Sequence, residues 1–482
     1  MVEGKHEKFW LIFHVLLGFG TAVSKFVLIA WVYILVGSTL IQLLKNKHRD
    51  FSLIHLVFYS LAIEQLNRSV KGWPLLPYEL GKYLSLIVFI VAMLYPNTSK
   101  RKSSVGMVFF LLTIPSVLIL PDNFVMNDVI FNYTGLLTMA LAMIYFAKQE
   151  FTFSQFKGLM RTFIYSAIAF TIYLYRYQAK LETKVTYDLA ANFDTAGGTA
   201  TNQVSTYLGL AFAIMVLMYL TRQKLFSTKF VDEALIIFFM FRGLITFSRG
   251  GMVSAILAIV VVLLMPKYNN LLQNAQVQFR KISLTTYIYS FLFIIVTFFV
   301  VNSITGNQLL LRYQGETQHS LRTGHKDIQS VTSHRYEIFI SDLLIFINNP
   351  LLGVGVGQSR WYRPMYDPEH FSEYGFLPHV EVSRMLADHG IFGVGMVCIF
   401  LFYPFYKVMN EKDNYKRAIM ILLFTIAVTS TFHTAMRTIL APIFFGLACV
   451  NLVPDPPFNP EHARNKSKRK KEKASKRTPA LA

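Results

Sequence analysis

Two arginines, Arg242 and Arg249, interrupt a stretch from Ala234 to Met265 that is otherwise almost wholly apolar. The segment around them is FRGLITFSRGGMV. An ionisable side chain at membrane depth is costly unless it faces a polar cavity or a partner, so it indicates a functional site by default. The two arginines are two helical turns apart, which predicts that they project from nearly the same helix face with about 10 Å of rise between them.

A bound anion would compensate both charges. Guanidinium groups pair with phosphate oxygens in bidentate fashion, and arginine keeps its proton in a partly dry site. A polyprenyl diphosphate fits this chemistry, because its tail belongs in lipid and its diphosphate lies at the interface. Ser248 and Gly250, in the sequence SRGG, are small and would allow the backbone or a ligand to approach closely. The alternatives are a structural ion pair for Arg242 and snorkelling to the interface for Arg249.

The elements that must position these arginines are predicted to be membrane helices. Of the 482 residues, 54% are hydrophobic and only 15% are charged, which places the chain outside the usual soluble range. We expect an all-α polytopic membrane protein with 12–14 transmembrane helices, because only helices or closed barrels satisfy their backbone groups in lipid and alternating barrel-type segments are absent. Hydropathy predicts spans near 9–22, 25–44, 52–69, 80–96, 104–120, 128–147, 158–177, 204–221, 231–247, 252–265, 285–302, 388–407, 418–434 and 437–453.

Basic connectors fall at every second turn of this count. Together with the tail 454–482, which holds nine Lys or Arg between 464 and 477 against one Glu, they predict that both termini are cytoplasmic. We interpret the tail as an anchor attracted to anionic membrane lipids, and expect no nucleic-acid partner. The predicted organisation is a transmembrane domain at 1–453 followed by this basic cytoplasmic tail.

The other side of the membrane carries one very long connector, at 303–385, which is far beyond the usual loop length and indicates function. Within it, HRYEIFISDLLIFINNP predicts an amphipathic helix at the outer interface, ended by Asn349 and Pro350, with Arg335 near the headgroup level. The glycines of LLGVGVGQSRW lack the flanking strand and the GK[ST] of a nucleotide loop. A turn that allows close backbone approach is the better interpretation.

Histidines are frequent in this connector, but they show no HExxH or other tight ligand spacing, so we predict no metal site. No single histidine can be chosen as catalytic from spacing alone. The histidines concerned are His319, His325, His334, His370, His379 and His389.

Several of these features together resemble the superfamily of O-antigen ligases and O-antigen polymerases. They are the many-spanning layout, SRGG at the outer end of a late span, the large outer loop, the run R…NNPLLGVGVGQS and the segment HVEVSRMLADHGIFG. The resemblance is densest from about 203 to 408. The ligase pattern of His, then Asn, Ser or Gln, nine residues, Gly, two residues, and Gly, Thr or Tyr maps onto His379, Val380, Gly390 and Gly393, and only Val380 departs from it. A second pattern, Arg with Leu four residues on, is met loosely by Arg335 with Phe339.

The resemblance implies a C-type glycosyltransferase-like membrane fold. It implies an enzyme that moves a glycan from an undecaprenyl-diphosphate carrier to an acceptor hydroxyl at the periplasmic face, with no metal and no cofactor. Arg249 and Arg335, with Arg242, would bind the diphosphate, and His379 would be the general base. Ser248, Gly250, Gly390 and Gly393 would form the supporting turns.

Alternatives stay open at this point. The acceptor is either the lipid A core, for a ligase, or the growing glycan, for a repeat-unit polymerase, and both use the same donor. A transporter or flippase of lipid-linked sugars is an alternative of another class, although it would favour ionisable residues near the midplane of paired halves. A purely structural scaffold leaves Arg242 and Arg249 unexplained. The family resemblance further implies the inner membrane of a Gram-negative bacterium.

Overall fold

The structure is a computed structural model, and we describe the parts of the chain whose placement is defined. These are residues 2–45, 50–94, 103–181, 187, 189, 193–265, 284–326, 332, 335–369, 371 and 380–455.

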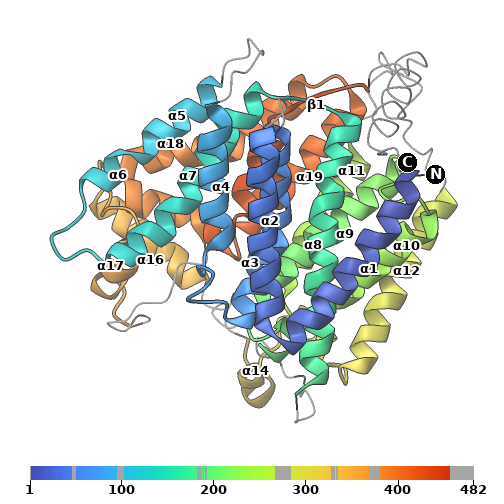
Figure 1. The fold of residues 1–482 in the computed structure, drawn as a ribbon. Coiled ribbons are helices and arrows are strands. Elements are labelled where there is room, and N and C mark those ends of the chain that lie inside the picture. The colour runs from blue at the N-terminus through green and yellow to red at the C-terminus, as the bar shows by residue number, and fades with distance from the viewer. Residues whose placement is uncertain are drawn as a thin grey trace, which may run out of the picture.

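The described residues form a bundle of helices with one very small sheet (Figure 1). The first half comprises α1 (Val2–Val23), α2 (Lys25–Lys45), α3 (Asp50–Val70), α4 (Leu80–Met93), α5 (Ser104–Thr113), α6 (Pro115–Leu118), α7 (Met126–Lys148), β1 (Glu150–Thr152), α8 (Phe153–Ala179), η1 (Asp194–Ala196) and α9 (Thr201–Leu220). The second half comprises α10 (Lys229–Ile245), α11 (Arg249–Leu264), α12 (Leu284–Ile304), α13 (Gln308–Tyr313), α14 (Gln318–Thr323), α16 (Arg335–Asn348), α17 (Ser359–Tyr366), α18 (Glu381–Asn410), α19 (Asn414–Ser430), η2 (Ala435–Arg437), α20 (Leu440–Leu447) and β2 (Asn451–Val453).

The predicted fold class is confirmed: the chain is an all-α polytopic membrane protein. Every span predicted from hydropathy overlaps a helix, because long apolar runs satisfy their backbone groups as helices. Within the described residues, four helices are long and apolar enough to cross a membrane by length and composition alone, namely α2, α7, α9 and α18. Shorter apolar helices accompany them, so the figure of 12–14 spans stays a prediction.

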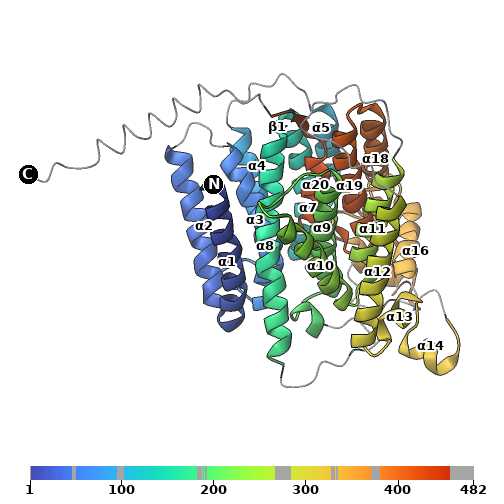
Figure 2. The same cartoon turned by 90° about the vertical axis from the view of Figure 1, so that its right-hand side faces the viewer.

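The two ends of the bundle are distinguished by hydrogen bonds between distant segments. At one end, Ser227 N–H donates to Glu7 at 2.6 Å and Ser154 N–H donates to Asp455 at 3.0 Å. The strands β1 and β2 pair in parallel at the same end. We call this the terminal end, because α1 starts there and β2 finishes there. The opposite end carries α13 and α14, and we call it the loop end (Figure 2).

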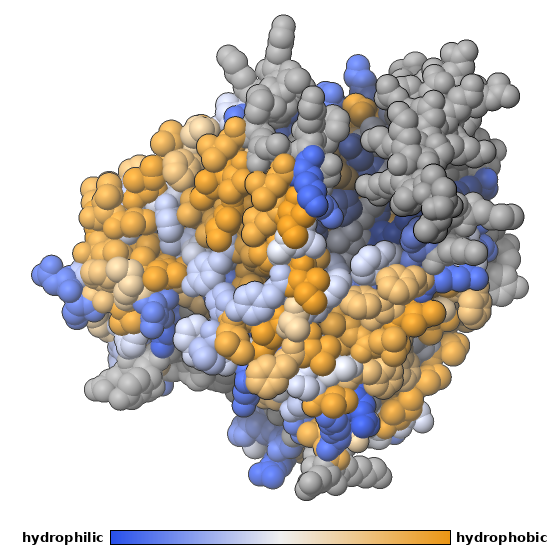
Figure 3. Space-filling view, viewed as in Figure 1, coloured by the Kyte–Doolittle hydropathy of each residue, from blue (hydrophilic) through white to orange (hydrophobic). Residues whose placement is uncertain are grey.

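The bundle is built around α9, which is buried along most of its length. By contrast, α1 and α2 expose large apolar side chains such as Phe9, Leu16 and Ile34. Apolar residues cover most of the face seen in Figure 3, and hydrophilic ones gather near its edges. This inversion of a soluble surface is what contact with lipid requires.

Glycines let α9 and α11 approach closely. A Cβ at Gly251 would lie 2.2 Å from the carbonyl carbon of Ser205, and a Cβ at Gly209 would lie 2.4 Å from the carbonyl oxygen of Gly251. The amide of Gly251 donates to Ser205 Oγ at 3.2 Å. Because lipid gives no hydrophobic drive between helices, such small residues supply the packing that fixes the position of α11.

We therefore expect Gly251→Ala to destabilise the protein by about 1–3 kcal/mol, the usual cost of overpacking. The measurement is thermal unfolding of the purified protein in detergent. Gly37→Ala on α2 is the matched control, because a Cβ there meets nothing within 4 Å, and it should be neutral or stabilising. Equal melting temperatures for Gly251→Ala and the wild type would contradict the proposed packing.

The basic connectors of the sequence, combined with the arrangement of the ends, predict a membrane topology. A reporter that is active only outside the cytoplasm should be active when inserted at Gly315, after α13, and inactive when fused after Ala482. An insertion at Lys224, in the connector that also contains Ser227, should be inactive as well, because this connector lies at the terminal end. Activity at Lys224 without activity at Gly315 would place the loop end in the cytoplasm.

Candidate functional site

Arg242 and Arg249 lie on two different helices. The helix α10 ends at Ile245 and α11 begins at Arg249, with Phe247 between them in the left-handed region at φ 58°. The prediction that both arginines share one helix face is therefore wrong. Hydropathy had already separated the predicted spans 231–247 and 252–265, but the prediction of a shared face assumed one continuous helix across this gap.

Arg242 is fully buried and joins α10 to α8 and η1. Its Nη1 donates to Gln178 Oε1 at 2.8 Å, and its Nη2 donates to the carbonyl oxygen of Thr195 at 2.6 Å. The guanidinium also lies over the ring of Tyr175, with Cζ 5.0 Å from the centroid. Neutral oxygens and an aromatic face thus surround this charge, and the arrangement fixes the helix that leads to Arg249.

Arg249 and Arg335 are brought together from distant parts of the sequence. Arg335 is the first residue of α16, and its Nη1 donates to the carbonyl oxygen of Thr332 at 2.9 Å. Burial, and then the positive charge of Arg249, lower the pKa of Arg335. Tyr313, at the end of α13, is close to Arg249. Burial raises the pKa of its phenol, and the positive charge of Arg249 acts against that rise. The loop end therefore holds two guanidinium groups near one phenol.

His433 is a further residue of this site, and the sequence analysis missed it. A Cβ at Gly250 would lie 2.4 Å from Cγ of His433, so the imidazole packs directly on the backbone of SRGG. Its Nε2 is 2.9 Å from Thr206 Oγ1, and its Nδ1 is 3.2 Å from the carbonyl oxygen of Thr429. The positive charge of Arg335 acts on this ring. The polar run TSTFHTAMRT between two apolar spans was the available signal.

His379 lies outside the described residues, but the chain directly after it is well fixed. The amide of Glu381 donates to the carbonyl oxygen of Thr431 at 3.0 Å, and Glu381 Oε2 accepts from the amide of Met436 at 2.9 Å. The start of α18 is thereby attached to the turn that contains His433.

Gly390 and Gly393, the two glycines of the ligase pattern, allow α18 to bend. Gly390 has φ 59° and ψ −133°, and a Cβ there would lie 2.6 Å from the amide nitrogen of Gly353. A Cβ at Gly393 would lie 1.9 Å from the carbonyl oxygen of Met385. The bend makes room for the chain at 351–355 against α18. It also leaves His389 buried inside the protein.

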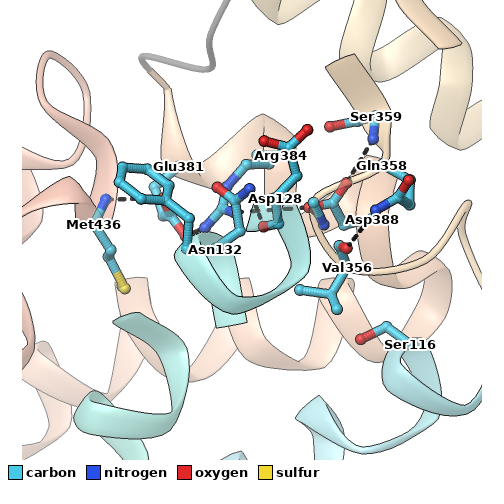
Figure 4. A network of polar contacts seen from close by, with 12 residues as sticks. Ser116, Asp128, Asn132, Val356, Gln358, Ser359, Glu381, Arg384, Asp388 and Met436 are labelled. Carbon is cyan, nitrogen blue, oxygen red and sulfur yellow. Dashed lines mark hydrogen bonds and ion pairs between the residues drawn. The ribbon is translucent and has the colours of Figure 1, made fainter. Parts of the chain in front are cut away.

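We call residues 351–361 (LLGVGVGQSRW) the glycine-rich loop. A network of polar contacts attaches it to α18 and α7 (Figure 4). Asp388 accepts from the amides of Gly357 at 2.8 Å and Ser359 at 3.0 Å. Asp128 on α7 accepts from Trp361 Nε1 at 2.9 Å and Arg360 at 3.2 Å. The amides of Gly357 and Ser359 thus serve contacts within the protein, in agreement with the interpretation that this is not a nucleotide loop.

The predicted amphipathic helix is confirmed as α16, which ends at Asn348. Its polar face points into the protein: Asp342 is buried and bonds to Arg363 Nε at 2.9 Å and to Ser383 Oγ at 2.7 Å. Its exposed residues include Tyr336 and Ile347. Apolar exposure at this position fits a helix whose outer face meets lipid.

Ser248 precedes α11 as its N-cap residue, without a side-chain capping bond. Within the described part of the chain, we find no group of three His, Cys, Asp or Glu side chains arranged to hold a metal ion.

Comparison with known proteins assigns the region that contains these residues. No curated protein sequence matches the chain. Residues 234–398, from α10 into α18, match the family described as O-antigen ligase. This match supports the resemblance to the O-antigen ligase superfamily seen in the sequence, over that part of the chain.

Proposed function

We propose that this protein transfers a glycan from an undecaprenyl-diphosphate carrier to an acceptor hydroxyl at the loop end of the bundle. The family supports an enzyme of the O-antigen ligase or polymerase type. We propose the ligase reaction, with the lipid A core as acceptor, because the spacing from His379 to Gly390 and Gly393 follows the ligase pattern. A repeat-unit polymerase would use the same donor and a growing glycan as acceptor. The proposed location is the bacterial inner membrane, with both termini cytoplasmic.

The proposal rests on the convergence of Arg249 and Arg335. The charge of Arg249 acts on Arg335, although the two begin separate helices, α11 and α16. Like charges at short range raise each other's free energy in a partly dry site, and a diphosphate between them would lower it. Arg249 is also the first residue of α11, so the amides of that helix terminus add positive potential.

In the proposed reaction the acceptor oxygen forms a bond to the anomeric carbon of the glycan. The bond between that carbon and the phosphate oxygen breaks, and its electron pair leaves with the undecaprenyl diphosphate. Arg249 and Arg335 would stabilise the charge that grows on the leaving oxygen, which is an electrostatic contribution to catalysis. His379 would act as the general base and take the proton of the acceptor hydroxyl. Arg242, which the sequence analysis grouped with them as a diphosphate ligand, donates to Gln178 and Thr195, and we propose that it holds α10 in place beside them.

Arg249→Gln and Arg335→Gln should each lower transfer by about 100-fold or more, because each removes a charge-assisted contact to the leaving group. The measurement is the rate of glycan transfer from a lipid-linked donor by purified protein in lipid nanodiscs. Arg222→Gln is the control, since this exposed arginine lies in the connector at the terminal end. Wild-type rates for both Arg249→Gln and Arg335→Gln would exclude the proposed binding of the diphosphate by these two arginines.

His379→Ala should abolish transfer while donor binding persists, because the base acts on the acceptor rather than on the diphosphate. Binding can be followed with a fluorescent polyprenyl diphosphate, and transfer with the same nanodisc assay. His319→Ala, in the exposed helix α14, is the matched control and should behave as the wild type. Normal product formation by His379→Ala would show that another residue is the base.

A further inference from the structure

We call Arg249 and Arg335 the donor clamp. A second group of arginines surrounds η2, and it belongs neither to the family patterns nor to the donor clamp. We call it the Arg437 cluster, and it consists of Arg437, Arg384 and Arg68. The carbonyl oxygen of Arg437 accepts from Arg68 Nη2 at 3.0 Å. The preceding amide, of Met436, donates to Glu381, which also forms an ion pair with Arg384. The cluster is therefore assembled from α3, α18 and η2 by direct hydrogen bonds.

The arginines around Arg437 each have an acidic partner. Arg68 pairs with Glu64 at 2.5 Å, and Arg384 pairs with Glu381. Arg363 forms an ion pair with Asp342 at 2.8 Å. The positive charge of Arg363 also acts on Arg437.

Arg437 itself differs from its neighbours. Among the described residues no ion pair with a carboxylate is found for Arg437, which is half-buried; its Nε and Nη2 are buried and have no hydrogen-bond partner there. The positive charges of Arg384 and Arg68 act on Arg437. Guanidinium donors that are buried without an anion are unfavourable, and nearby cations make them more so. An anion in contact with Nε and Nη2 would satisfy them, since these two donors form the fork that matches an oxyanion.

The side chain of Arg437 is not needed for the contacts that hold the turn together. Arg68 bonds to the backbone carbonyl of residue 437, which any amino acid provides. Glu381 bonds to the backbone amide of residue 436. The local structure therefore does not explain why a long cationic side chain stands at this position.

The cluster borders the site proposed for transfer. Arg437 follows His433 by one short turn, and His433 packs on Gly250 and is influenced by the charge of Arg335. On the other side, Glu381 follows His379 in the sequence by two residues. Since Arg249 and Arg335 account for the donor diphosphate, an oxyanion at Arg437 would belong to a different molecule at the same site.

We infer that the Arg437 cluster is a second oxyanion site, which binds a phosphate or carboxylate group of the acceptor glycan. The existence of the site stands on the geometry of the cluster, whereas its assignment to the acceptor rests on the proposed function.

Inorganic phosphate is the probe for the site itself. We would measure thermal unfolding of the full-length protein in nanodiscs, with sodium phosphate or with sodium chloride of equal ionic strength. The background is the double variant Arg249→Gln, Arg335→Gln, so that the donor clamp does not contribute. Phosphate should still raise the melting temperature in this background. Adding Arg437→Met should abolish that rise without lowering the melting temperature in chloride, because an uncompensated charge is removed.

The controls make each outcome decisive. Arg222→Met, at the terminal end, should leave the phosphate response intact. If Arg437→Met also lowers the melting temperature in chloride, Arg437→Lys decides: a recovered phosphate response supports the site, and no recovery overturns it. The site is also overturned if phosphate raises the melting temperature equally with and without Arg437→Met. It is overturned as well if phosphate does not raise the melting temperature of the double variant Arg249→Gln, Arg335→Gln.

A second measurement tests the assignment to the acceptor. In the transfer assay with otherwise wild-type protein, Arg437→Met should raise KM about tenfold or more for an acceptor that bears phosphate or carboxylate, and leave KM for the donor unchanged. KM for an uncharged acceptor should not change. If phosphate binds at Arg437 but KM for the acidic acceptor is unaffected, the anion is a lipid headgroup or free phosphate, and the acceptor assignment is overturned. Absence of any transfer by the wild type would refute the proposed function and leave the phosphate result standing.

Discussion

Compensation of guanidinium charge in a poorly hydrated environment is the constraint on which this structure depends. The chain meets it in different ways at different places. Arg242 uses carbonyl and amide oxygens together with an aromatic ring, and thereby joins three elements. Arg363 uses the carboxylate of Asp342, and this buried pair connects α17 to α16. Buried charges with one fixed partner favour one arrangement of the elements that carry them, because removing either partner leaves an uncompensated charge.

Glycines determine where these charged elements can approach one another. Gly250 lets His433 rest on the backbone beside Arg249, and Gly251 lets α11 lie against α9. Gly390 bends α18 so that the glycine-rich loop fits beside it. In each case a side chain would collide with backbone or with a buried ring, which a packed interior cannot absorb at low cost. The positions of the proposed clamp residues therefore follow from backbone contacts as much as from charge.

The sequence predicted the parts of this structure that depend on periodicity and composition. Spans were found because hydropathy averages over many residues, and α16 was found because Asn349 and Pro350 mark its end. Hydropathy separated the spans 231–247 and 252–265, but it could not show the left-handed conformation of Phe247, which puts Arg242 and Arg249 on different helices. His433 was missed because its importance comes from contact with Gly250, almost two hundred residues earlier in the sequence. Spatial proximity of this kind becomes visible only when the helices are placed.

The direction of the polar face of α16 shows how the long loop is held at the membrane. Glu337, Ser341 and Asp342 face the protein, while Tyr336 and Ile347 face outward. An isolated amphipathic helix would place its polar side in water, but this helix places it on buried partners from α17 and α18. Arg335 begins the same helix, so the contacts that fix α16 also fix the orientation of this arginine toward Arg249. A rigid support of this kind suits electrostatic catalysis, which requires that the charges be in position before the reaction begins.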